Sequence, residues 1–240
     1  MLMLEYLSLS DAELNAVYLS LKVAFWSILC SLPVAIATAW VLARCQFWGK
    51  SILNSIIHLP LVLPPVVIGY LLLTTMGRNG WLGKHLMEWF GFSFAFSWHG
   101  AALASAVVTF PLVVRSIRLA IESVDIKLEQ AARTLGASAL RTFFTITLPL
   151  SSAGILAGVI LGFARSLGEF GATITFVSNI PEVTRTIPLA MYSFIETPGA
   201  EGAAARLCVI AIIISLISLL ASEWLAKRTQ QRLGQYHARN

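Results

Sequence analysis

The sequence predicts an all-α integral membrane protein with five transmembrane helices. Apolar residues make up 57% of its 240 residues and charged residues only 12%, whereas soluble domains contain about 25% charged residues. The mean hydropathy is correspondingly high, at +0.78. Apolar segments of roughly 18 or more residues can cross the hydrocarbon core as helices, and the chain contains five of them. We therefore expect one transmembrane domain over residues 1–240.

The first expected span follows an acidic segment that contains Glu5, Asp11 and Glu13. This segment lacks the basic start and the small-residue cleavage site of a removable signal peptide, so we expect the first span to be retained. Glycine and proline within several spans do not exclude them, because membrane helices tolerate both residues. The expected spans cover about residues 23–43, 52–76, 97–114, 150–170 and 207–226.

The second span is unusual because it contains Pro60, Pro64 and Pro65. Each proline lacks an amide hydrogen and leaves a carbonyl about four residues earlier without its usual donor. Broken backbone at membrane depth persists where protein covers it or where it lines a water-filled cavity. The second span is therefore either a wall of a path through the membrane or a kinked packing helix.

The fourth span contains two charged residues near its end, Arg165 and Glu169. They are four residues apart, so a helix places them on one face. An isolated charge at the centre of a membrane helix costs roughly 2.5 to 3.5 kcal/mol on insertion scales. This cost favours a structural charge pair, and a water-filled surface is the alternative.

Lysine and arginine fall mainly on one side of the predicted membrane, which indicates the cytoplasmic side. With the N-terminus outside, this side receives the C-terminus and the segment between the third and fourth spans. Its basic residues are Arg44, Lys50, Arg115, Arg118, Lys127, Arg133, Arg141, Lys227, Arg228, Arg232 and Arg239. The other side receives Arg78, Lys84, Arg185 and Arg206.

The cytoplasmic segment over about residues 118–148 is polar and rich in small residues. Asp125 can cap a first short helix, and Gly136 fits the left-handed position just past its end. Ser138 can begin a second helix. The pattern predicts a short helical hairpin suited to insertion into another protein, although an amphipathic helix at the membrane surface would also fit.

This segment resembles the EAA signature of the permease subunits of binding-protein-dependent ABC importers. The matching residues are Gln130–Ala132, Gly136 and Ile146–Pro149, at the spacing of the signature. Gln130 stands where that family usually has glutamate, and Glu129 lies one place earlier. The resemblance implies a type I ABC importer permease fold with a hairpin that docks on a cytoplasmic ATPase. By resemblance, the ATPase-coupling residues are Glu129, Gln130, Ala131, Ala132, Gly136 and Ala137.

Further segments resemble the oxyanion branch of this family, which includes sulfate/thiosulfate and molybdate/tungstate systems. Ala164–Thr173, Phe176–Pro181, Leu59–Pro65 and Arg133–Ala137 extend the match over nearly the whole chain, which is most similar to molybdate permeases. Neutral hydroxyls and exposed amides can hold such an anion without trapping it, whereas an unpaired Glu169 would repel it. The expected translocation-path residues are Pro60, Pro64, Pro65, Ser166, Gly168, Gly171 and Thr173.

The resemblance also implies the partners and the location of the chain. Two copies would form one pore in the bacterial cytoplasmic (inner) membrane, surrounded by lipid. Two cytoplasmic ATPase subunits would bind ATP and Mg, so this chain would need no cofactor of its own. A soluble molybdate-binding protein would dock outside.

Other classes of protein find little support in the sequence. Gly49–Ser51 resembles the end of a phosphate-binding loop, but Arg44 replaces the required glycine. The four histidines and three cysteines have no metal-site spacing, and the net charge of +5 is explained by topology and anionic lipids better than by nucleic acid. We therefore expect neither catalytic residues nor a metal site. An ion-gradient-driven secondary transporter is the alternative class. It would require charged relay residues in the spans or an internal repeat. Most of the expected spans lack such residues and no repeat is visible, which counts against this class.

Overall fold

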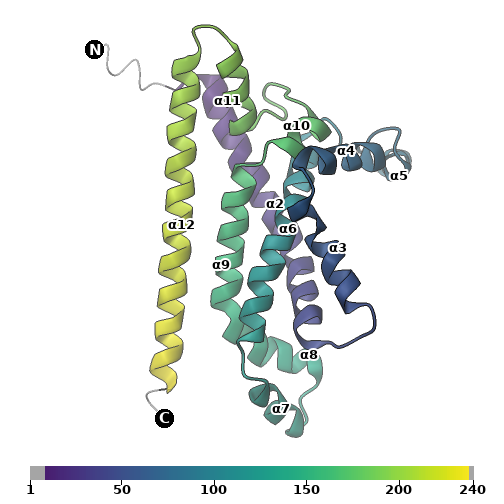
Figure 1. Ribbon diagram of the computed structural model, residues 1–240, viewed down its shortest axis with the longest axis vertical. Coiled ribbons are helices and arrows are strands. Elements are labelled where there is room, and N and C mark those ends of the chain that lie inside the picture. Colours follow the sequence, from purple (N-terminus) through teal and green to yellow (C-terminus); the bar gives the residue numbers. More distant parts are fainter. Residues whose placement is uncertain (1–8, 238–240) are drawn as a thin grey trace.

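The computed structural model describes residues 9–237, and all regular secondary structure within this range is helical. Three long helices form the centre of the molecule: α2 (Asp11–Arg44), α6 (Trp98–Glu122) and α9 (Leu148–Leu167). The fourth, α12 (Glu201–His237), packs along α9 (Figure 1). Glu5 and Arg239, used above to assign topology, lie outside the described residues.

Shorter helices cover the two ends of this bundle. At one end, called the hairpin end below, lie α7 (Ile126–Thr134), α8 (Ala139–Thr142) and the π-helical turn η1 (Phe143–Thr147) (Figure 1). The opposite end contains three more short helices. These are α5 (Trp81–Phe90), α10 (Gly171–Val177) and α11 (Ile187–Glu196).

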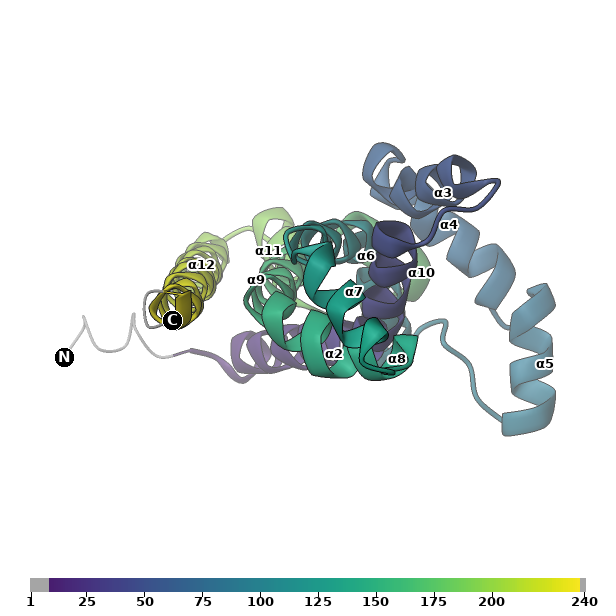
Figure 2. The same ribbon diagram turned by 90° about the horizontal axis from the view of Figure 1, so that it is seen from below.

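The predicted second span is not one straight helix. It divides into α3 (Lys50–Val62) and α4 (Pro65–Met76), and the chain bends by 111° between them. Leu63 and Pro64 each precede a proline, which disfavours the helical conformation, and both are extended, with ψ of 139° and 134°. Pro60, in contrast, remains inside α3. We call α3 and α4 together the bent arm; it and α12 lie on opposite sides of the three central helices (Figure 2).

The bounds of the other spans also differ from those expected. The first helix begins at Asp11, where Ser10 and Glu13 form a capping box, and not near residue 23. The third continues to Glu122, and the fourth ends at Leu167. Within the described residues, four helices are long and apolar enough to cross a membrane, or five spans exist if the bent pair counts as one.

Small residues allow the central helices to approach closely. A Cβ atom added at Gly154 of α9 would collide with the Cβ of Ala120 in α6, and one added at Gly158 would lie 3.1 Å from Ser116. At Gly162 the added atom would lie 2.6 Å from Val113. Glycine at every fourth position thus forms a flat stripe on α9, the typical device for close packing of membrane helices.

We predict that Gly154→Ala lowers the thermal unfolding temperature of the detergent-solubilised protein. The added methyl group cannot be accommodated unless α6 and α9 separate, and overpacking of this kind costs about 1 to 3 kcal/mol. Gly202→Ala is the matched control, because Gly202 is exposed and only the tip of Arg206 lies nearby. An equal or higher unfolding temperature for Gly154→Ala would contradict the close contact of α6 and α9.

Candidate functional site

The hairpin end has the turn geometry that the sequence predicts. Asp125 caps α7 by accepting a hydrogen bond from the amide of Lys127 (2.9 Å), and Ser138 caps α8. Gly136 has φ +87°, in the left-handed region. The amide of Ala137 donates to the carbonyl of Ala132 (3.0 Å), and that of Gly136 donates to the carbonyl of Arg133 (3.0 Å). These two bonds form a Schellman motif that closes α7 and fixes the turn.

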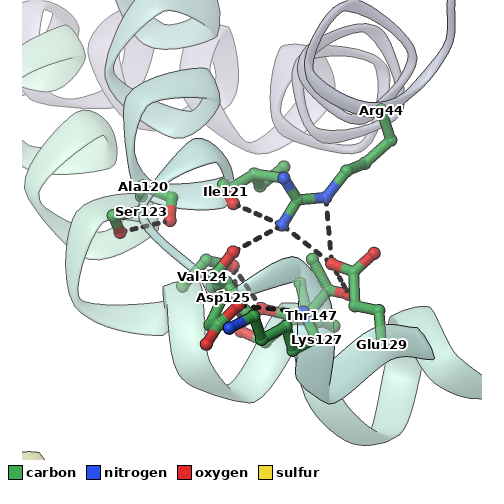
Figure 3. Close-up of polar contacts among 11 residues, drawn as sticks. Arg44, Ala120, Ile121, Ser123, Val124, Asp125, Lys127, Glu129 and Thr147 are labelled. Carbon is green, nitrogen blue, oxygen red and sulfur yellow. Dashed lines mark hydrogen bonds and ion pairs between the residues drawn. The ribbon is translucent and has the colours of Figure 1, made fainter. Parts of the chain in front are cut away.

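The hairpin is fastened to the bundle by a buried polar cluster around Arg44 and Glu129 (Figure 3). The Nε atom of Arg44, in the last turn of α2, donates to Oε1 of Glu129 (2.9 Å). The hydroxyl of Thr147 donates to the same oxygen (2.9 Å). Nη2 of Arg44 donates to the carbonyls of Ile121 and Val124, each at 2.9 Å.

This cluster joins four segments at one point. Arg44 ends α2, Glu129 belongs to α7 and Thr147 belongs to η1. Ile121 lies in the last turn of α6, and Val124 lies two residues past its end. The Ile121 carbonyl also accepts a hydrogen bond from the Val124 amide (3.2 Å), so Arg44 reinforces the turn that follows α6. Glu129 is only 4% exposed, so it supports the hairpin from inside and is not part of its exposed surface.

The residues of the expected coupling motif that reach the hairpin surface are neutral or apolar. Gln130, Ala131 and Gly136 are exposed, whereas Ala132 and Ala137 are half-buried. Five large apolar side chains are also exposed on the hairpin, and such patches mark interaction sites for proteins or membranes. They are Ile126, Leu128, Leu135, Leu140 and Phe144, of which Leu135 is 89% exposed.

The expected path residues gather near the bend but do not all face open space. A Cβ atom at Gly171 would lie 2.9 Å from Pro65, so the start of α10 touches the start of α4. Gly168 is exposed. Ser166 and Thr173 are 4% and 1% exposed, and so are enclosed within the subunit in this conformation.

Arg165 and Glu169 form an ion pair with 3.0 Å between Nη1 and Oε2. The other carboxylate oxygen of Glu169 accepts a hydrogen bond from the amide of Ala172 (3.0 Å). Glu169 is 2% exposed, whereas the side chain of Arg165 is 41% exposed. The carboxylate therefore holds the junction between α9 and α10 and has both of its oxygens engaged.

The sequence did not predict the structural role of Arg44, which entered only the topology and the exclusion of a phosphate-binding loop. Glu129 lies 85 residues further along the chain, so no local spacing relates the two. The available signal was an arginine at the end of a span, where a helix leaves carbonyls without partners. Among the residues that the structure describes, no group of histidine, cysteine or acidic side chains could hold a metal ion.

We predict that Arg44→Ala destabilises the protein by about 3 to 5 kcal/mol, because it leaves the Glu129 carboxylate buried and unpaired. Adding Glu129→Gln should recover part of this loss, since the uncompensated charge is then removed. Denaturant unfolding of both variants in detergent measures the two effects, with Arg78→Ala, an exposed arginine, as control. Additive losses in the double variant would contradict the pairing.

Comparison with known proteins identifies the family. The family described as "Binding-protein-dependent transport system inner membrane component" matches residues 31–232. The molybdenum transport system permease protein ModB of Haemophilus influenzae is 72% identical over 223 residues, covering 93% of this chain and 97% of that protein. Its counterpart in Escherichia coli K12 is 65% identical over 226 residues, covering 94% and 99%.

A solved structure of an ABC transporter has a similar fold. The crystal structure of a bacterial ABC transporter involved in alginate import contains a chain that aligns with a TM-score of 0.70 and 18% identity. The alignment covers 91% of this chain and 80% of that one. Identity this low shows a shared fold only. Together, the matched family and the two highly identical relatives show that this chain belongs to the inner membrane components of binding-protein-dependent transport systems.

Proposed function

We propose that this chain is the membrane-spanning permease subunit of an ATP-driven molybdate importer in the bacterial cytoplasmic membrane. The observation that supports it most directly is the exposed hairpin, which the buried Arg44–Glu129 pair fastens to the bundle. A rigid projection of this kind is suited to receiving force from a partner protein. Support for molybdate comes from the two relatives named as molybdenum transport permeases.

We propose further that the hairpin end is cytoplasmic and that the chain crosses the membrane five times. This topology counts α3 and α4 as one bent span, places the N-terminus outside and makes residues 1–240 one domain. The support is the basic character of the hairpin end, where Arg44, Lys50, Arg133 and Arg141 lie, because cytoplasmic segments are enriched in such residues.

In this proposal the hairpin transmits movement from a separate ATPase subunit. Leu135, Leu140 and Phe144 would enter a groove on the ATPase, and Gln130 would contribute hydrogen bonds without a charge. When two ATPase subunits close on ATP and Mg, the hairpins of two copies of this chain would approach each other. Because each hairpin is tied to the ends of α2 and α6 and continues into α9, these helices would move with it.

The pore would lie between two copies of the chain, and a molybdate-binding protein would deliver the anion at the opposite end. The bend between α3 and α4 and the adjoining break between α9 and α10 provide irregular backbone there, which membrane proteins retain where it lines a cavity. We assign the path to Pro60, Pro64, Pro65, Gly168 and Gly171, and to Ser166 and Thr173 once they are uncovered by rearrangement. This chain itself would catalyse no reaction.

Uptake of labelled molybdate by proteoliposomes tests the proposal. The vesicles contain this chain and its ATPase, the binding protein is added outside, and either ATP is enclosed or an ion gradient is imposed alone. We expect uptake only with ATP. Gradient-driven uptake without ATP would identify a secondary transporter, and stronger competition by unlabelled sulfate than by molybdate would assign the chain to sulfate transport.

We predict that Gly136→Val impairs ATPase association and reduces ATP-driven uptake. A residue with a side chain in the left-handed region is strained by about 1 to 2 kcal/mol, and valine is among the worst suited. Gly199→Val is a matched control, since Gly199 is also exposed, has φ +84° and lies in a turn at the opposite end. Co-purification with the ATPase measures the effect. Equal loss of association in both variants would point to general destabilisation instead of hairpin geometry.

A further inference from the structure

A polar pocket of about 290 Å³ lies between the middle of α3 and the last third of α6. It is near the hairpin end, because α3 begins there and α6 ends there (Figure 1). Two arginines, a histidine, an amide and a carboxylate surround it. The lining residues are Asn54, His58, Arg115, Arg118, Leu119 and Glu122.

Arg115 is the most informative of these residues. Within the described part of the chain its side chain has no ion pair and no hydrogen bond, whereas Arg44, Arg118 and Arg165 are all paired. It lies in α6, a helix long and apolar enough to cross a membrane. Arg115 lies in the last third of α6, just past the expected third span, and its side chain is exposed, so its guanidinium is free to contact a ligand.

Hydrogen bonds link the other polar side chains around the pocket and hold them in place. Nε of Arg118 donates to Glu122 (2.7 Å), and its Nη1 donates to Oδ1 of Asn54 (3.1 Å). Because guanidinium groups only donate, the oxygen of Asn54 faces Arg118 and its amide nitrogen keeps two free hydrogens. Nδ1 of His58 lies 2.8 Å from the carbonyl of Asn54, which fixes the ring.

We infer that this pocket binds a tetrahedral oxyanion, with Arg115 as its main contact and Arg118 and Asn54 as additional donors. The inference rests on the proposed function and assigns the pocket to the transported anion on its way to the hairpin end. Among the arginine and carboxylate side chains of the pocket, two arginines against Glu122 leave one excess positive charge. A modest excess suits a transport site, because conduction requires binding that is weak enough for release.

The phosphate of a lipid headgroup has the same tetrahedral chemistry, so the experiment must separate the two sources. Equilibrium binding of labelled molybdate is measured on the detergent-purified complex of this chain with its ATPase. Native mass spectrometry of the same samples detects retained phospholipid. We expect Arg115→Gln to weaken molybdate binding about tenfold, the loss of one charge-assisted hydrogen-bonding group, and to slow ATP-driven uptake.

Two further variants serve as controls. Arg78→Gln makes the same charge change at an exposed position away from the pocket and should bind molybdate as wild type does. Arg115→Lys keeps the charge and should retain part of the affinity, which separates anion binding from misfolding.

Three results would overturn the inference. Unchanged molybdate binding and uptake in Arg115→Gln would show that the pocket is not the anion site. The proposed function would stand, because ATP-driven uptake by the wild type would still support it. Loss of a bound phospholipid from Arg115→Gln with unchanged molybdate binding would identify a lipid headgroup as the occupant. Absence of ATP-driven molybdate uptake by the wild-type complex would refute the proposed function itself.

Discussion

The buried ion pair between Arg44 and Glu129 is the constraint on which the hairpin end depends. Such a pair adds little net stability, because the desolvation of both charges offsets their attraction, but loss of either partner is strongly destabilising. Its effect is therefore mainly geometric. It requires the ends of α2 and α6, the hairpin helix α7 and the turn η1 to keep one arrangement around Arg44 and Glu129 (Figure 3).

Two other devices give the bundle its shape. The glycine stripe of α9 allows α6 to approach closely, and in lipid this close packing replaces the hydrophobic effect as the force between helices. Consecutive prolines after Leu63 break the second span, because each residue before a proline is driven toward the extended conformation. The first device makes the centre rigid, and the second turns α4 away from α3 by 111°. A rigid centre with one bent arm is suited to moving as a unit when the hairpin is displaced.

Local patterns predicted much of the candidate site. The caps at Asp125 and Ser138 and the left-handed turn at Gly136 depend on neighbouring residues only, and the structure contains all three. The ion pair of Arg165 and Glu169 matches the expected pairing at a spacing of four, although Glu169 lies two residues beyond the end of α9. The burial of Glu129, Ser166 and Thr173 was not predictable in this way, because it depends on which other helices cover them.

The sequence by itself determined the class of protein, the approximate positions of the apolar segments and the position of the hairpin, since apolar length and short-range turn chemistry specify these features. Only the tertiary structure decided that Glu129 is buried while Gln130 is exposed. It also decided that Arg115 and Arg118 of α6 share a pocket with Asn54 and His58 of α3. These relationships join residues about 60 to 85 positions apart. No periodicity within one helix can encode them, because they depend on the depth and rotation at which separate helices pack.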